Sequence, residues 1–397
     1  MKSTVDMRKI ILDFVKNETN YFKDTDNLAM IEIGDGNVNY IYRLYNEDQS
    51  MIIKFSDDHV RSNANRKLSS SRNKIEYNIL KKQGELSGGL VPKLYGFSEE
   101  KKLIAMEDLT GYKVLRIALE KKMIFPNFGN SMAKFLYDTL FKTTDLVSDS
   151  KTKKNAVSEL VNYDMCEISE RLVFTEPYLN QQGLNSFAEE NRRYVEENIY
   201  NNKKLHSEVA KLKLNFMTSS ESMIHGDLHS GSIFINDEGI KVFDPEFAFY
   251  GPMGYDIGNI VASLLITAMI DDFENHNKVS DFSKWLKKSV IEIIEGFINI
   301  YNEDYEKNVM TPMFNNDEFK SFYLSKILCE TAGYAGTEIL RRTIGVAKVL
   351  DIDRVKTEPD YNVIEKRLID IALELITNRN NLTSLEDYRK LIINEVK

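Results

Sequence analysis

Two short runs of β-branched and aromatic residues, each leading to an aspartate, interrupt a part of the chain that is otherwise helical in pattern. The run at 224–235 carries Asp227 in its turn, and the run at 242–246 delivers Asp244 with Glu246 two residues further on. A strand–loop–strand unit can aim such carboxylates at one point. Phosphoryl transfer needs them, because one carboxylate orients the attacking hydroxyl and another holds the magnesium that bridges the ATP phosphates. The pattern therefore favours a kinase.

Length, charge and cysteine content narrow the class of protein. A chain of 397 residues can bury a large core and divide into two lobes. Its net charge of −9 argues against nucleic acid or an anionic membrane as partner, since either would need a basic face. Two cysteines give no disulfide framework, the first ten residues lack the apolar core of a signal peptide, and the longest apolar run, 257–270, is too short to span a membrane. We expect a cytoplasmic protein with a small-molecule partner.

The order of the patterns predicts an α+β fold. A short helix at 5–16 opens the chain, and residues 29–108 then have mainly strand character. The predicted elements there are strands at 31–33, 38–45, 51–55 and 103–106 and a helix at 72–83. The predicted later helices are 113–122, 128–142, 153–171, 185–212, 255–273, 281–304, 318–349 and 362–378. We predict a bilobal, protein-kinase-like fold, with a small β-rich, ATP-binding N-lobe over 1–108, a hinge near 106–110 and a large, mainly helical C-lobe over 109–397.

Asp227 is the candidate catalytic carboxylate, which would orient the acceptor hydroxyl and accept its proton. Asp244 and Glu246 are the candidate Mg²⁺ ligands, because magnesium prefers a few carboxylate oxygens supplemented by phosphate and water. The alternatives are an aspartate that caps a turn and an acidic turn after a strand. Protein kinases place a metal-binding asparagine five residues after the catalytic aspartate, where this chain has Ser232.

A glycine-containing turn between two predicted strands is the candidate phosphate-covering loop. Glycine lets backbone amides approach phosphate oxygens closely. The candidate residues in this loop are Gly34, Gly36, Asn37 and Asn39. Asn39 occupies the place of the third glycine of the usual kinase loop, so an ordinary hairpin turn remains the alternative.

Lys54 is the one charged residue in an apolar strand, and Glu76 lies in the helix that follows. A lysine–glutamate pair of this kind fixes the lysine on the α- and β-phosphates of ATP. The alternative for Lys54 is an edge-strand lysine, and the partner glutamate could lie one helical turn away. Glu107, Asp108 and Leu109 would form the hinge whose backbone binds adenine.

Two further groups of residues allow more than one interpretation. His225 and His229, with Asp244 and Glu246 nearby, could form the zinc site of a hydrolase, or His225 could brace the catalytic loop. Arg341 and Arg342 lie on a predicted helix, where adjacent residues point about 100° apart. They are either ligands of the substrate or a solvated helix face.

The longer motifs resemble the S-methyl-5-thioribose kinase family. They are 225–232 (HGDLHSGS) followed by 244–258 (DPEFAFYGPMGYDIG), together with 33–39 (IGDGNVN), 173–178 (VFTEPY) and 341–347 (RRTIGVA). Choline and aminoglycoside kinases share only the short His-Gly-Asp pattern. The resemblance extends over residues 31 to about 351, which is nearly the whole chain.

The resemblance implies transfer of the ATP γ-phosphate to the 1-hydroxyl of 5-methylthioribose, in methionine salvage, by a homodimer. It implies that Asp227 is the base, that Asp244 and Glu246 hold Mg²⁺, and that Arg341 and Arg342 contact the substrate or the transferring phosphate. The alternatives are a kinase for a choline-, aminoglycoside- or homoserine-like acceptor, an ATP-binding regulatory module, and the metal hydrolase. The regulatory module would have lost Lys54, Asp227 or Asp244, and all three are present.

Overall fold

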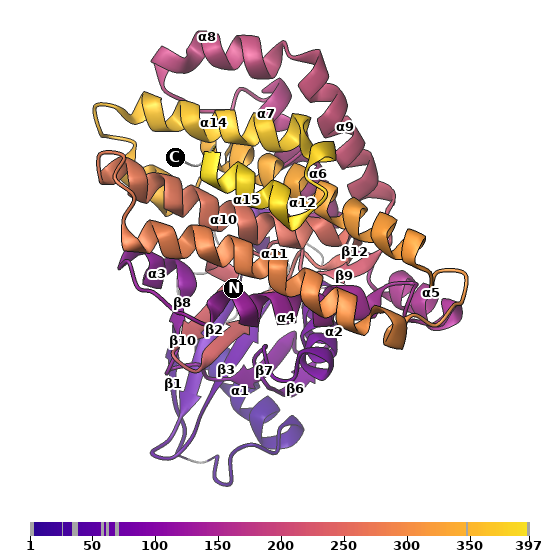
Figure 1. The fold of residues 1–397 in the computed structure, drawn as a ribbon. Helices are drawn as coiled ribbons and strands as arrows, with labels where there is room; N and C mark the ends of the chain where they lie inside the picture. The colour runs from indigo at the N-terminus through magenta and orange to yellow at the C-terminus, as the bar shows by residue number, and fades with distance from the viewer. Residues whose placement is uncertain are drawn as a thin grey trace.

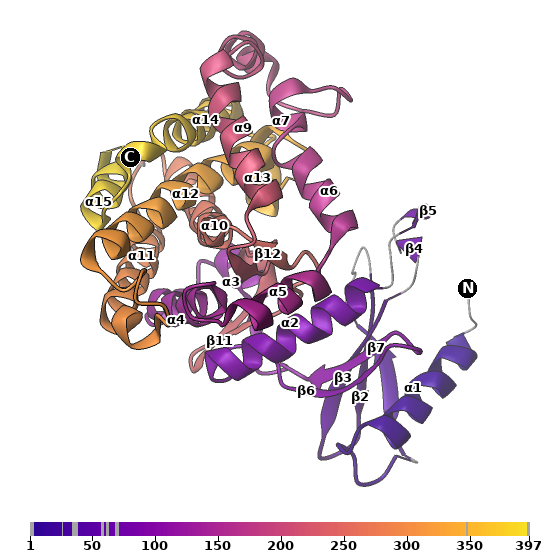
Figure 2. The same cartoon turned by 90° about the vertical axis from the view of Figure 1, so that its right-hand side faces the viewer.

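The computed structural model describes residues 4–25, 27–33, 39–56, 59–60, 63–67, 71–346 and 348–394. Within them the chain forms a small lobe built on an antiparallel sheet and a larger lobe of helices (Figures 1 and 2). The predicted α+β, kinase-like fold class is confirmed. The boundary at residue 108 remains a prediction, and we use N-lobe and C-lobe for the parts on either side of it.

The N-lobe is a five-stranded sheet with a helix on each face. Its strands run in the order β1-β2-β3-β7-β6, and every neighbouring pair is antiparallel. Helix α1 covers one face and α2 lies on the other, between the sheet and the C-lobe (Figure 2). The elements are α1 (Thr4–Glu18), β1 (Ala29–Glu32), β2 (Tyr40–Tyr45), β3 (Ser50–Phe55), β4 (His59–Val60), β5 (Asn63–Lys67), α2 (Ser71–Ser87), β6 (Leu94–Ser98) and β7 (Leu103–Glu107).

The two-residue period of β3 decides where Lys54 points. Successive side chains of a strand face opposite sides of the sheet. Met51 and Ile53 pack into the core beneath α1, so Ile52 and Lys54 face the other side and line the cavity between the lobes. Lys54 is therefore not an edge-strand lysine, because β3 lies at the centre of the sheet.

The C-lobe is helical with short strands that carry the catalytic segments. Its first elements are β8 (Lys113–Val114), α3 (Leu115–Glu120), α4 (Phe128–Leu140), α5 (Ser150–Glu159), α6 (Tyr163–Leu172), α7 (Glu176–Leu179), α8 (Arg192–Val195) and α9 (Lys203–Thr218). The others are β9 (Ser222–Ile224), β10 (Ile233–Asn236), β11 (Gly239–Val242), β12 (Phe249–Gly251), α10 (Met253–Glu274), α11 (Asp281–Asn308), α12 (Asp317–Ile344), α13 (Leu350–Val355), α14 (Tyr361–Thr377) and α15 (Leu385–Asn394).

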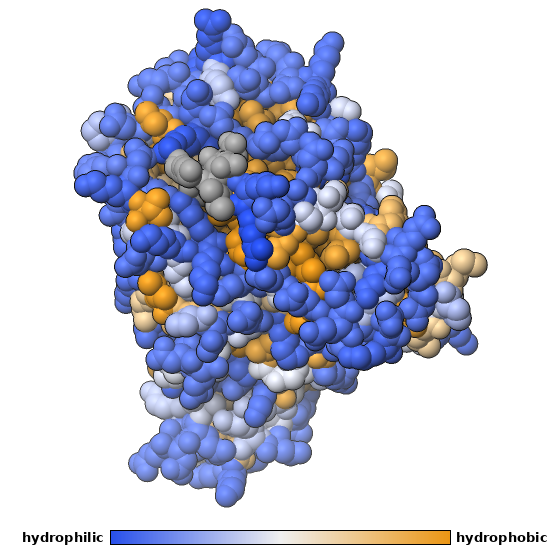
Figure 3. Space-filling view, in the orientation of Figure 1, coloured by the Kyte–Doolittle hydropathy of each residue, from blue (hydrophilic) through white to orange (hydrophobic). Residues whose placement is uncertain are grey.

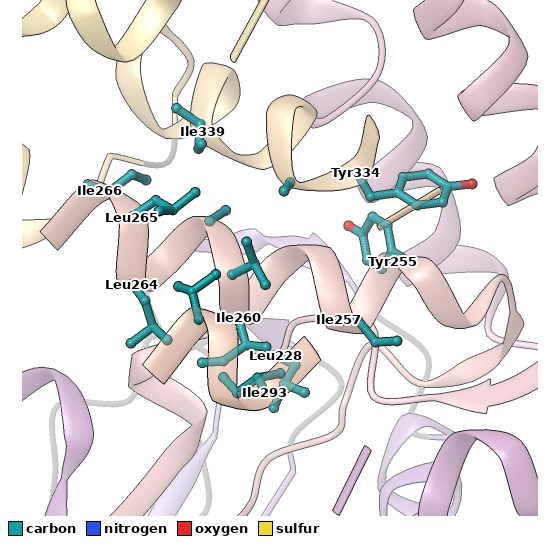
Figure 4. Close-up of a cluster of buried hydrophobic side chains, with 14 of the residues drawn as sticks. Leu228, Tyr255, Ile257, Ile260, Leu264, Leu265, Ile266, Ile293, Tyr334 and Ile339 are labelled. Atoms are coloured by element: carbon teal, nitrogen blue, oxygen red, sulfur yellow. The ribbon is translucent and has the colours of Figure 1, made fainter. Parts of the chain in front are cut away.

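Helix α10 is the centre of the C-lobe. It packs against α11 and α12, where Ile260 and Leu264 lie among Leu228, Ile293 and other apolar side chains (Figure 4). By length and composition α10 could cross a membrane, but 94% of its apolar window is buried inside the fold. Most of the face seen in Figure 3 is hydrophilic, with apolar residues gathered near its middle. We interpret α10 as a core helix.

Two glycines let α10 and α12 approach closely. A Cβ at Gly258 would lie 2.7 Å from the backbone nitrogen of Ala335, and a Cβ at Gly254 would lie 2.8 Å from that of Thr331. Both distances are shorter than real Cβ contacts, so larger residues would push the helices apart. The close approach brings the C-terminal end of α12, with its two arginines, toward the catalytic loop.

Several predicted helix boundaries were wrong. The predicted helix 153–171 is divided into α5, which ends at Glu159, and α6, which begins at Tyr163. In the break, the side-chain amide of Asn162 donates to the carbonyl oxygens of Glu246 and Ala248 at 2.9 and 3.0 Å. The predicted helix 185–212 breaks at Asn202, which caps α9 by accepting from the Leu205 backbone N–H at 3.0 Å. The predicted helix 113–122 begins as β8, which pairs with β10. The predicted helix 318–349 ends at Ile344. Strands β4, β5, β6 and β12 and helices α7, α13 and α15 were not predicted.

Candidate active site

The catalytic loop between β9 and β10 is held from below by helix α10. The carboxylate of Asp256 accepts hydrogen bonds from the backbone N–H groups of His225 at 2.6 Å and Gly226 at 3.0 Å. Gly226 has φ of +82°, and a Cβ there would lie 2.3 Å from the carbonyl oxygen of Phe247. Only glycine fits this turn, which immediately precedes Asp227.

His225 braces the same loop. One ring nitrogen, Nδ1, accepts from the Asp227 backbone N–H at 3.3 Å, and the other, Nε2, lies 2.9 Å from the carbonyl oxygen of Phe243. The imidazole thereby joins the catalytic loop to the strand that precedes Asp244. Because both ring nitrogens are used within the protein, His225 is a structural residue. The described residues contain no group of three or more His, Cys, Asp or Glu side chains arranged to hold a metal.

Asp227 lies among positively polarised groups. Its Oδ1 is 3.1 Å from Nη2 of Arg341 and 3.5 Å from Nη2 of Arg342, and its Oδ2 is 3.3 Å from Nε2 of His229. Burial alone would raise the pKa of Asp227, but His229 and the two arginines lower that pKa well below its usual range. These neighbours therefore favour the ionised form of the carboxylate.

His229 was not among the predicted catalytic residues. Its Nδ1 accepts from the backbone N–H of Gly231 at 2.8 Å, which places the ring proton on Nε2, facing Asp227. A Cβ at position 231 would lie 2.5 Å from the imidazole ring, so glycine there makes room for it. The hydroxyl of Ser232 donates to the carbonyl oxygen of Asp227 at 2.6 Å and so holds the loop together.

In the N-lobe, the ammonium group of Lys54 contacts two carboxylates, those of Glu76 and Asp244. Its Nζ lies 2.7 Å from Oε1 of Glu76 and also contacts Oδ1 of Asp244. Burial alone would lower the pKa of Lys54, but Asp244 and Glu76 raise it, so the ammonium keeps its charge. Asp244 has φ of +65°, a left-handed conformation that is uncommon outside glycine and is typical of functional sites.

Glu246 is a buried carboxylate with an excess of negative charge around it. Burial and the nearby Asp244 carboxylate raise the pKa of Glu246 to about 8. Its Oε2 accepts from Nδ2 of Asn39 at 3.2 Å, and Oδ1 of Asn39 accepts from Nη2 of Arg72 at 3.2 Å. A raised carboxylate pKa beside a second carboxylate is the electrostatic signature of a site that gains from a bound cation. The donor set, two hard carboxylates at the end of a cleft, fits Mg²⁺.

A cavity of about 680 Å³ connects these groups to the hinge. Lys54, Glu76, Asp244 and Glu246 line one end, and Glu107, Asp108 and Leu109 line the other. The rings of Phe234 and Phe243, 4.4 Å apart, also line the cavity and were not predicted. Its size and mostly apolar walls suit a nucleotide.

Polar contacts fix the hinge. Asp108 pairs with Nε of Arg43 at 2.5 Å, Glu107 pairs with Nζ of Lys241 at 3.1 Å, and the carbonyl of Leu109 accepts from the Tyr112 N–H at 2.8 Å. The structure thus brings Asn39, Lys54, Glu76, Asp244, Glu246 and the hinge residues together in the lining of one cavity. Asp227 is not part of that lining and instead contacts His229, Arg341 and Arg342. Gly34, Gly36 and Asn37 lie outside the described residues, so the phosphate-loop prediction is open there.

The twin arginines converge instead of forming a solvated face. Arg341 and Arg342 are about nine-tenths buried, and both direct Nη2 at the same oxygen of Asp227. Glu338, one turn earlier on α12, accepts from Nε of Arg341 at 2.5 Å and from Nε of Arg342 at 2.7 Å. The spacing of three and four residues between a glutamate and two arginines was the signal in the sequence that could have identified Glu338.

A two-lobed fold with a lysine–glutamate pair, two metal-type carboxylates and an aspartate on the loop after a short strand is typical of the kinase-like phosphotransferases. In agreement, residues 153–277 match the phosphotransferase enzyme family. The chain is 35% identical to a methylthioribose kinase of Bacillus velezensis, over 94% of this chain and 93% of that one, and 32% identical to one of Geobacillus thermodenitrificans, over 94% and 92%. The chain belongs to the methylthioribose kinase family.

The fold is also similar to more distant kinases of known structure. An ethanolamine kinase of Plasmodium vivax aligns with a TM-score of 0.48 at 14% identity, over 96% of this chain and 97% of that one. A spectinomycin phosphotransferase in complex with ADP and spectinomycin aligns with the same TM-score at 13% identity, over 92% and 98%.

Proposed function

We propose that this protein transfers the γ-phosphate of ATP to the 1-hydroxyl of 5-methylthioribose, the reaction of methionine salvage. The observation that carries the proposal is the identity of about one third to methylthioribose kinases over nearly the full length of both chains. The site supports it independently of the relatives' names, because Lys54, Asp244 and Glu246 line one cavity and Asp227 lies against two arginines in the C-lobe.

In the nucleotide half of the site, ATP occupies the cavity with its base at the hinge and its phosphates toward Lys54. Glu76 holds Lys54 at 2.7 Å, so that its ammonium is oriented to contact the α- and β-phosphates. Asp244 and Glu246 would hold Mg²⁺, which supplies charge neutralisation of the phosphate oxygens when bound. Asn39 positions Glu246 through its side-chain amide.

In the acceptor half, Asp227 receives the hydrogen bond of the 1-hydroxyl and aligns its oxygen with the γ-phosphorus. The bond from that oxygen to phosphorus forms while the bond to the leaving ADP oxygen breaks, and the hydroxyl proton passes to Asp227. A carboxylate of low pKa suits this role, because in a loose transition state the hydroxyl is oriented first and loses its proton late. Arg341 and Arg342 then stabilise the negative charge of the transferring phosphoryl group.

The charge of the acceptor half also bears on which acceptor binds. Two guanidinium groups face Asp227, whereas a site for choline or an aminoglycoside needs carboxylates to meet a cationic acceptor. A neutral sugar that becomes an anion on phosphorylation suits the arginines better. We therefore favour the sugar over the amino-alcohol acceptors.

The test is ADP formation with Mg·ATP and 5-methylthioribose, with choline, an aminoglycoside, homoserine and ribose in parallel. We expect turnover that is confined to methylthioribose. Turnover on another acceptor would contradict the substrate but keep the mechanism. Nucleotide binding without turnover on any acceptor would instead favour the regulatory module.

Two further expectations from the sequence belong to this proposal. We propose that the protein is a homodimer and that it works in the cytoplasm, without nucleic acid or membrane partners. Size-exclusion chromatography with light scattering tests the first statement. A monomeric mass at micromolar concentration would contradict it.

A further inference from the structure

The side chain of Glu338 lies at the centre of the acceptor half, although it belongs to none of the groups that kinase chemistry requires. Only 2% of it is exposed. Oε2 accepts from Nε of Arg341 at 2.5 Å, whereas Oε1 accepts from Nη2 of Arg341 at 3.2 Å and from Nε of Arg342 at 2.7 Å. One carboxylate thus binds both guanidinium groups, through Nε of each arginine and also through Nη2 of Arg341, which it shares with Asp227.

This arrangement explains how two adjacent helical residues reach one target. Side chains at neighbouring helix positions leave the axis about 100° apart, so Arg341 and Arg342 would diverge on their own. Glu338 lies three and four residues before them and is therefore a neighbour of both on the helix surface. With each Nε bound to Glu338, both Nη2 atoms point at Oδ1 of Asp227, at 3.1 and 3.5 Å.

The charges of the cluster balance only with Glu338 included. Arg341 and Arg342 carry two positive charges, and Asp227 and Glu338 carry two negative ones. Without Glu338, Asp227 would be the only carboxylate beside the two guanidinium groups. They would then bind Asp227 more tightly, because a buried charge without compensation is costly. An acceptor hydroxyl can displace a guanidinium from Asp227 more easily when that guanidinium is also held elsewhere.

We infer that Glu338 is a positioning residue for phosphoryl transfer, which orients both arginines toward Asp227 and the transferring phosphoryl group and keeps Asp227 accessible to the acceptor. It acts through the arginines and touches neither substrate. The inference rests on the proposed kinase function. It predicts that Glu338 affects the sugar step and leaves nucleotide binding unchanged, because the nearest nucleotide-binding carboxylates lie on other elements.

The experiment compares the wild type with Glu338→Gln, which has the same shape but no charge. We expect kcat/KM for methylthioribose to fall about 100-fold, comparable with the loss of one transition-state donor, with the KM for ATP and the Kd for ADP unchanged within about twofold. Glu338→Asp, which keeps the charge but cannot reach both arginines, should recover only part of the activity.

Glu330→Gln is the matched control. Glu330 lies two turns earlier on α12, is also buried, and pairs with Nζ of Lys326 at 2.9 Å, away from Asp227. Its substitution removes a buried ion pair from the same helix and should leave kcat/KM for the sugar within about threefold of the wild type. If both variants lose activity alike, the role of Glu338 is only structural and the inference is wrong.

A double-mutant cycle tests whether Glu338 affects catalysis through Arg341. If Glu338 acts through Arg341, Glu338→Gln should cost far less in an Arg341→Ala background than in the wild type, whereas independent effects would multiply. Multiplicative losses would overturn the inference. Should Glu338→Gln fail to fold, the same cycle is run with Glu338→Asp. Absence of wild-type turnover on methylthioribose would contradict the proposed function instead, so the two failures are distinguishable.

Discussion

The nucleotide half and the acceptor half of the site have opposite arrangements of charge. The nucleotide half gathers Glu76, Asp244 and Glu246 around the ammonium of Lys54. The acceptor half sets Asp227 against two buried guanidinium groups. The same residue type responds in opposite ways, because the pKa of Glu246 is raised to about 8 and the pKa of Glu338 is lowered to about 2.

The difference indicates what each half lacks before reaction. The nucleotide half has more carboxylates than its lysine neutralises, so it gains from a divalent cation that arrives with ATP. In the acceptor half, Asp227 and Glu338 balance the charges of Arg341 and Arg342, so the guanidinium groups can shift their hydrogen bonds to the negative charge that moves onto the sugar. Transfer of the phosphoryl group carries charge from the first half to the second. If the halves are separable, a substitution in one half changes the use of one substrate only.

The largest effect is expected for Asp227→Asn. The amide keeps the shape but can neither accept the hydroxyl proton nor balance the arginines, so we expect kcat to fall by about 10³-fold or more. The Kd for ADP, measured by calorimetry, should stay within about twofold because Asp227 lies outside the nucleotide half. Retention of full activity would contradict the assignment of Asp227 as the base.

A paired comparison of Lys54→Met and Arg341→Ala tests the division directly. Each should lower kcat/KM by about 100-fold, because each removes a positively charged side chain that stabilises the phosphate groups during transfer. Lys54→Met should raise the KM for ATP, whereas Arg341→Ala should raise the KM for the sugar or lower kcat alone. If both changes acted on the same substrate, the halves would not be separable.

Acid stability tests the charge balance around Glu338. Burial alone would raise the pKa of Glu338, but Arg341 and Arg342 lower it to about 2, against an ordinary value of 4.5. A depressed carboxylate pKa stabilises the fold fully above pH 4.5, and that stabilisation is lost as the pH falls toward 2. The wild type should exceed Glu338→Gln in free energy of unfolding by up to about 3 kcal/mol above pH 4.5, and urea titrations at pH 7 and pH 3.5 should show the gap shrinking. A difference in free energy of unfolding that is the same at both pH values would contradict the lowered pKa of Glu338.

The parts of the site that were predictable from the sequence depend on local patterns. Lys54 stood out as a charge in an apolar strand, and Glu76 as a glutamate in the following helix. The 2.7 Å contact between them shows that Glu76, and not a residue one helical turn away, is the partner of Lys54. Asp227 and Asp244 were identifiable because each follows a short strand within a helical region.

The parts that were not predictable depend on contacts between segments that are far apart in the sequence. Asn39 meets Glu246 across 207 residues, and Arg341 meets Asp227 across 114. A local pattern also could not reveal that the long helix predicted at 153–171 must break so that Asn162 can reach the backbone near Glu246. In each case a tertiary hydrogen bond overrides or adds to what the local pattern indicates.

The smallest effect, and the one most specific to the nucleotide half, is expected for Glu246→Gln. The amide can still accept from Asn39 but is a weaker ligand for a divalent cation than a carboxylate. We therefore expect the Mg²⁺ concentration for half-maximal activity to rise about tenfold, with the KM for the sugar unchanged, because the acceptor half needs no cation. Titration of activity with Mg²⁺ at saturating ATP measures this directly, and Glu330→Gln serves as the control that removes a carboxylate elsewhere. An unchanged Mg²⁺ requirement would mean that Asp244 alone meets the metal, and the excess negative charge around Glu246 would then need another explanation.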